Sequence, residues 1–202
     1  MKIIELILDE EQEEGGIEAI SIVESPAIES DFVALNNQEI KLAEIDKEKR
    51  ILLGALLIPN KPIYRNGDEG DYYIFFSKDT IVKASQMYLK NGYQNSTTLE
   101  HDQALKGLTL VESWIVESET QDKSRKYGLN VPVGTWMGAV KVNNNEIWNE
   151  YVKTDKVKGF SIEGYFADKM EKPKEKIKED MSKEDKILEK IIKILTPENA
   201  EK

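Results

Sequence analysis

The segment at residues 158–166 constrains the fold most, because its side chains alternate with a period of two. In extended backbone, Phe160 and Ile162 would lie on one side, with Ser161 and Glu163 on the other. Such alternation predicts a half-buried β-strand with an apolar face and a polar face. Glycines on both sides of the serine would let other backbone or a ligand come close.

Other segments rich in β-branched and apolar residues predict a β-rich α+β fold. The predicted strands are residues 2–8, 17–23, 50–58, 72–76, 96–101, 108–117 and 134–142. Ser77 or Asp79 can cap a helix that runs to Lys90, and a second helix is predicted at residues 146–152.

Beyond Asp168 the composition changes to nearly continuous Lys, Glu and Asp, and a short amphipathic helix follows Ser182. We therefore predict a folded domain at residues 1–168 and a charged linker with a helical tail at residues 169–202. The tail helix would either dock on its own domain or bind a partner.

Composition narrows the classes of function. The chain has 202 residues and a formal net charge of −10, and its mean hydropathy is −0.52. This charge offers no basic surface for nucleic acid or for an anionic membrane, so we expect neither partner. The longest apolar run, residues 51–59, is too short to span a bilayer, and acidic residues interrupt the N-terminal segment. We therefore expect the protein to act in a cytoplasm.

The chain has one histidine and no cysteine. Thiolate chemistry and a histidine-rich metal site are thereby excluded, and we expect neither metal nor cofactor. The hypothesis that remains is nucleophilic attack by a hydroxyl that an imidazole activates, with His101 as base and Ser161 as nucleophile. Such a base needs an acceptor on its other nitrogen.

Glu18 is a candidate for this acceptor, since strict alternation places it on the same side of the strand at residues 17–23 as Ile20 and Ile22. A glutamate on an apolar face must reach water, pair or shift its pKa. The pattern leaves open whether Glu18 is a site residue or a strand-end residue in solvent.

Three segments resemble the prohead serine proteases of tailed phages, which are relatives of the herpesvirus assemblins. Residues 99–102, Leu-Glu-His-Asp, resemble the strand-end histidine motif, and residues 157–166 resemble the nucleophile strand G-x-(L/F)-S-I-G-(F/Y). Residues 17–27 resemble a glutamate-bearing strand that follows the serine in those proteases, whereas it comes first here. The order resembles a circularly permuted version, similar to the phage serine proteases encoded upstream of the capsid gene in Bacillus-type prophages.

The resemblance implies a closed, mostly antiparallel β-barrel with flanking helices, assemblin-like and circularly permuted. It implies Ser161 as nucleophile, His101 as base and Glu18 as third member of the triad. The family has glycine where this chain has Glu163, and this carboxylate is the alternative acid.

The implied function is a serine endopeptidase that cleaves scaffold and capsid proteins, and itself, inside the assembling prohead in the bacterial cytoplasm. The partners would be these phage proteins and further copies of the chain. One alternative is a catalytically idle assembly factor on the same fold. Another, from composition alone, is an acidic binding domain without a role in assembly.

Overall fold

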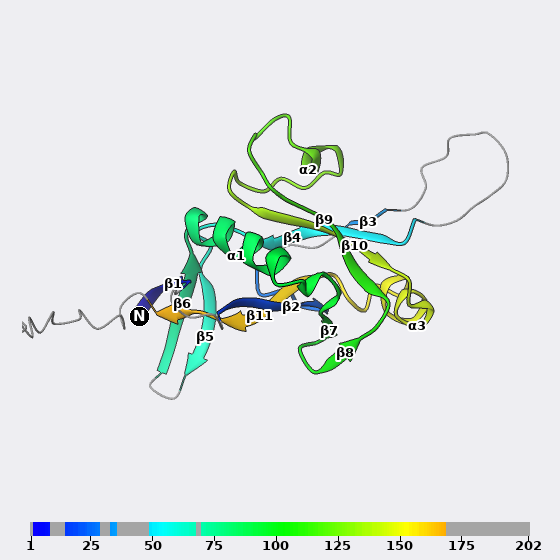
Figure 1. The fold of residues 1–202 in the computed structure, drawn as a ribbon, viewed down its shortest axis with the longest axis horizontal. Helices are drawn as coiled ribbons and strands as arrows, with labels where there is room; N and C mark the ends of the chain where they lie inside the picture. The colour runs from blue at the N-terminus through cyan, green and yellow to red at the C-terminus, as the bar shows by residue number, and fades with distance from the viewer. Residues whose placement is uncertain (1, 9–14, 29–32, 36–48, 68–69, 169–202) are drawn as a thin grey trace, which may run out of the picture. The chain divides into compact units, whose positions relative to one another are not determined.

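The computed structural model describes residues 2–8, 15–28, 33–35, 49–67 and 70–168 (Figure 1). The strands of these ranges are β1 (Lys2–Ile7), β2 (Gly16–Val23), β3 (Val33–Leu35), β4 (Ile51–Leu57), β5 (Ile63–Gly67), β6 (Gly70–Phe76), β7 (Thr97–Leu99), β8 (Gln103–Leu105), β9 (Leu108–Ile115), β10 (Trp136–Val142), β11 (Gly159–Tyr165) and β12 (Ala167–Asp168). The helices are α1 (Lys78–Lys90), α2 (Lys123–Lys126) and α3 (Asn145–Ile147), a 3-10 turn at Tyr93–Asn95 and a π-helical turn at Trp148–Val152.

The strands form three four-stranded sheets, ordered β12-β1-β6-β5, β3-β4-β10-β9 and β11-β2-β7-β8. Most neighbouring strands run antiparallel, and the parallel pairs are β1 with β6 and β2 with β7. The predicted β-rich α+β class is confirmed.

The prediction of a closed barrel is wrong for the described residues. A barrel closes only when the first and last strands of one sheet pair with each other, and each of the three sheets keeps two edges. β11 approaches β4 of the neighbouring sheet without pairing to it. Alternation identifies which segments are strands, but it says nothing about which edges meet.

The apolar core contains the inner faces of the strands and one side of α1. Trp136 on β10 and Tyr88 on α1 are both fully buried, with ring centroids 5.7 Å apart. Phe160 and Ile20 bring β11 and β2 into the same core. The opposite face of β11 and β2 is thereby left for polar residues.

The predicted helix up to Lys90 is confirmed as α1. Ser77 is its N-cap and accepts a hydrogen bond from the Thr80 N–H at 3.4 Å. The predicted linker and tail at residues 169–202 lie outside the described residues. Within the described ranges, no helix combines the length and the apolar character needed to cross a membrane.

Candidate active site

β11 positions two of the candidate site residues on one face. Ser161 and Glu163 are two residues apart, so they point the same way, with Cα atoms about 6–7 Å apart. Phe160, on the opposite face, is fully buried, whereas Ser161 and Glu163 are both half-buried. The strand therefore places its hydroxyl and its carboxylate together on the side away from the core.

β2 and β7 continue this polar face with small side chains. Ser161 lies opposite Ser21 on β2, and Ser21 lies beside Thr98 on β7. Ala19 lies opposite Glu163. Because the methyl group of Ala19 is short, the Glu163 side chain can pass over β2 to reach β7.

The histidine lies in the tight turn between β7 and β8. Glu100 and His101 both have left-handed backbone, with φ of 52° and 61°. Consecutive non-glycine residues of this kind are uncommon, and they persist where surrounding contacts hold them.

Three contacts hold this turn against β2 and the residue that follows it. The Glu100 N–H donates to the Ile22 carbonyl at 3.1 Å, and the Glu100 carboxylate accepts from the Glu24 N–H at 2.6 Å. The His101 N–H donates to Ser21 Oγ at 3.0 Å. The turn therefore carries the imidazole back over the polar face of the sheet.

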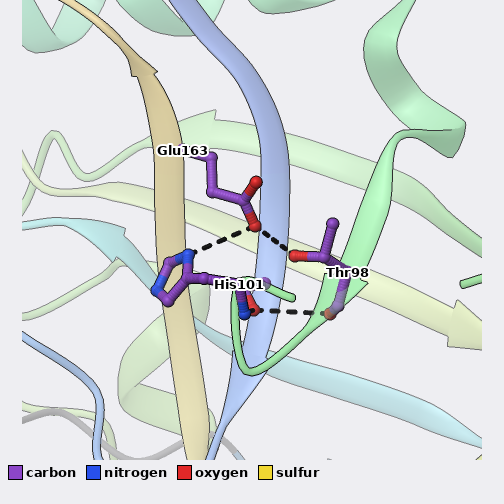
Figure 2. A network of polar contacts seen from close by, with 4 residues as sticks. Thr98, His101 and Glu163 are labelled. Carbon is purple, nitrogen blue, oxygen red and sulfur yellow. Dashed lines mark hydrogen bonds and ion pairs between the residues drawn. The ribbon is translucent and has the colours of Figure 1, made fainter. Parts of the chain in front are cut away.

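Glu163 connects the histidine turn to β7. His101 Nδ1 lies 3.2 Å from Glu163 Oε1, and the same oxygen accepts a hydrogen bond from Thr98 Oγ1 (Figure 2). The side chains of His101 and Glu163 are 42% and 30% exposed, so the pair lies where a substrate can reach it.

This contact selects a tautomer of the neutral imidazole. A carboxylate only accepts hydrogen bonds, so this contact favours the tautomer with the proton on Nδ1. Nε2 then has the lone pair and is the nitrogen that can take a proton from a nucleophile. The chemistry that the arrangement supports is base-assisted attack by a hydroxyl.

Ser161 and Ser21 are the serines nearest this pair by strand register. Ser21 is fully buried, and its hydroxyl already accepts from the His101 N–H and donates to the Thr98 carbonyl at 3.4 Å. Ser161 is half-buried, so of the two it is the one that a substrate can reach. Among the described residues, no hydrogen bond joins the Ser161 hydroxyl to the imidazole, and catalytic contacts of this kind often tighten only when substrate binds.

In the described residues, Glu18 makes no hydrogen bond or ion pair with His101 or Glu163. The register of β11 with β2 passes from Glu163 opposite Ala19 to Gly164 opposite Ile17, so Glu18 is the extra residue of a β-bulge. The bulge breaks the strict alternation that would place Glu18 with Ile20, and Glu18 is exposed. In the part of the chain that the structure describes, the acid that contacts His101 is the alternative acid, Glu163.

The contacts of Ser21, Thr98 and Glu100 at this site were not predicted from the sequence. Thr98 and Ser21 are small polar residues inside apolar strands, on the side that alternation assigns away from the core, and this was the available signal. Glu100 gave no such signal, because its contact with the Glu24 N–H depends on the left-handed turn. Within the described residues no group of three or more His, Asp or Glu could hold a metal ion.

Comparison with known protein families adds independent information. The model of the family described as "Putative phage serine protease XkdF" matches residues 39–171, which is more than half of the chain. The chain belongs to this family. The residues that match the XkdF family include β7, the histidine turn and β11, and they do not include β1 and β2. No curated protein and no solved structure matched the chain.

Proposed function

We propose that the chain is a prohead maturation serine endopeptidase in which Ser161 is the nucleophile, His101 the base and Glu163 the acid that orients the base. The observation that carries this proposal is the 3.2 Å contact between His101 Nδ1 and Glu163 Oε1. Glu163 lies two residues beyond Ser161 on β11. Membership of the XkdF family supports the same class of chemistry.

In this mechanism Ser161 Oγ attacks the carbonyl carbon of the scissile peptide bond while His101 Nε2 takes the hydroxyl proton. The imidazolium that forms is stabilised by the Glu163 carboxylate at Nδ1. It then gives its proton to the leaving amine, the C–N bond breaks and an acyl-enzyme remains. Water, deprotonated by the same imidazole, hydrolyses the ester and regenerates the Ser161 hydroxyl.

The substrates in this proposal are phage scaffold and capsid proteins, cleaved inside the assembling prohead in the host cytoplasm, together with the enzyme itself. Support comes from the phage serine protease family and from the three resembling segments. The order of those segments also fits circular permutation. β1 pairs with β12 and β2 pairs with β11, so the two ends of the described domain lie side by side, as a permuted chain requires.

One observation favours the alternative of a catalytically idle assembly factor. In the described residues, the Ser161 hydroxyl makes no hydrogen bond to His101. A protein that kept the fold only to bind capsid protein would not need that contact.

A fluorophosphonate probe, which reacts covalently with activated serines, separates the two functions. We expect the full-length protein to be labelled at Ser161, and we expect Ser161→Ala and His101→Ala to abolish labelling. Ser85→Ala is the matched control, because Ser85 is a buried serine on α1 that bonds only its own helix, at the Val82 carbonyl. Absence of labelling in folded wild-type protein would favour the idle assembly factor.

Self-cleavage provides a second test. We expect slow truncation of stored wild-type protein within residues 168–185, detected by intact mass, and no truncation of Ser161→Ala. Equal truncation of both proteins would assign the cut to a contaminating protease and remove this support.

A further inference from the structure

The polar face carries two hydroxyls that are neither nucleophile nor base. We propose that Ser21 and Thr98, which we call the hydroxyl pair, are positioning residues that hold the His101 turn and the Glu163 carboxylate in their working orientation. This inference rests on the proposed function of Ser161, His101 and Glu163.

Thr98 acts on the acid. Glu163 is on β11 and Thr98 on β7, with β2 between them, so the carboxylate reaches across a whole strand. A glutamate side chain has three rotatable bonds, and a contact at its tip selects among many rotamers. Thr98 is β-branched, so its hydroxyl occupies few positions and gives the carboxylate a fixed donor. Its bond to Oε1 places that oxygen where His101 Nδ1 meets it.

Ser21 acts on the base. Its fully buried hydroxyl accepts from the His101 N–H at 3.0 Å and donates to the Thr98 carbonyl at 3.4 Å. The left-handed backbone of His101 is costly for a residue with a side chain, so such contacts must hold it. Ser21 therefore links the residue that carries the base to the residue that orients the acid.

The simpler explanation is that these hydrogen bonds only satisfy polar groups. It applies to Ser21 in part, because a fully buried hydroxyl needs partners in any role. It does not account for Thr98, which is half-buried beside a carboxylate that is 30% exposed, where water can serve both groups. A direct hydrogen bond at such a site fixes the orientation of the carboxylate, and the tautomer of His101 reports that orientation.

The single histidine makes a direct test possible, since only one imidazole contributes to ¹⁵N spectra of the full-length protein. We expect neutral His101 to be the Nδ1–H tautomer in wild type. In Thr98→Val we expect a smaller share of neutral His101 to carry its proton on Nδ1. We also expect fluorophosphonate labelling of Ser161 to be slowed about tenfold or more. Thr98→Ser restores the hydroxyl and should restore both. Thr97→Val is the matched control, because Thr97 precedes Thr98 on β7 but faces the core at 4% exposed.

Ser21→Ala tests the second hydroxyl, with Ser85→Ala as its buried-serine control. We expect the same loss of the Nδ1–H tautomer in Ser21→Ala and none in Ser85→Ala. If Ser21→Ala does not fold, the Thr98 variants decide the proposal. If Thr98→Val has the same tautomer populations as the wild type, the positioning role of the hydroxyl pair is overturned, whatever the labelling rate. Absence of labelling in wild type would instead count against the proposed function, and the tautomer comparison would still test the hydroxyl pair.

Discussion

At the scale of single residues, the face of a strand on which a side chain lies decides its role. Thr97 and Thr98 are neighbours on β7 with the same chemical group. Thr98 faces the polar side and donates to Glu163, whereas Thr97 is 4% exposed among apolar residues. In the described part of the chain, the Thr97 hydroxyl has no hydrogen-bond partner.

This contrast predicts different effects of one substitution at adjacent positions, because Thr98→Val removes a hydrogen bond to Glu163 whereas Thr97→Val removes an unpaired hydroxyl. Thr97→Val replaces an unpaired buried hydroxyl by a methyl group of similar shape, so we expect the free energy of unfolding to rise by about 1 kcal/mol. Urea denaturation followed by circular dichroism measures it. A fall in stability would show that the hydroxyl has a partner, such as a buried water.

Whether Glu163 or Glu18 is the acid that orients His101 is also decided by single residues. We expect Glu163→Gln to slow fluorophosphonate labelling by at least about 100-fold, because an amide cannot stabilise the imidazolium as a carboxylate does. Glu18→Gln should label at close to the wild-type rate, since Glu18 is exposed at the bulge. The reverse result would restore Glu18 as the third member of the triad.

At the scale of elements, the bulge between β2 and β11 depends on close backbone contact. A Cβ on Gly164 would lie 2.0 Å from the Gly16 carbonyl oxygen and 2.8 Å from Ile17 Cα. Both are backbone atoms, so neither can turn aside as a flexible side chain would. Glycine at this position therefore lets β11 follow β2 through the bulge.

We expect Gly164→Ala to lower the free energy of unfolding by about 1–3 kcal/mol, because the strands must separate to admit the methyl group. The adjacent Tyr165→Phe is the control, since Tyr165 is 71% exposed and should change stability little. The midpoints of thermal unfolding of Gly164→Ala and Tyr165→Phe measure this difference. Equal midpoints for the two variants would mean that the bulge rearranges without a loss of stability.

The elements also show how far the sequence predicts this fold. The alternating strands 16–23 and 159–165 and helix α1 were predictable, because each has a strong period or a clear cap. β5 and β8 were missed, since a short strand next to a turn carries too few residues to show a period. Glu163 was predictable as an alternative acid, because it lies on the same side of its strand as Ser161. Its contact with His101 in preference to Glu18 was not predictable, because it needs the β2 register, the left-handed turn and Ala19 together.

At the scale of the whole molecule, stability should depend on pH through Asp122, the N-cap of α2. Burial raises the pKa of Asp122, but hydrogen bonds from the Ser124 N–H at 2.8 Å and the Trp114 indole at 3.3 Å favour the carboxylate. The net effect lowers its pKa below the ordinary value of 3.8. A lowered pKa means that the folded state favours the charged form.

The contribution of Asp122 to stability is therefore present above pH 3.8 and is lost as the pH falls through its folded-state pKa. We expect wild type to be more stable than Asp122→Asn at neutral pH, and the difference to shrink under acidic conditions. Urea titrations of both proteins at several pH values measure this. A difference that is constant with pH would exclude the linkage.

The central position of β2 in its sheet has a consequence for biosynthesis. β2 leaves the ribosome early, but one of its neighbours, β7, lies mid-chain, and the other, β11, is near the end of the described residues. β2 and β11 can therefore pair only when translation of this domain is almost complete. A nascent or truncated chain that ends before β11 lacks both Ser161 and Glu163, so the order of synthesis would delay the proposed proteolytic activity until the domain is whole.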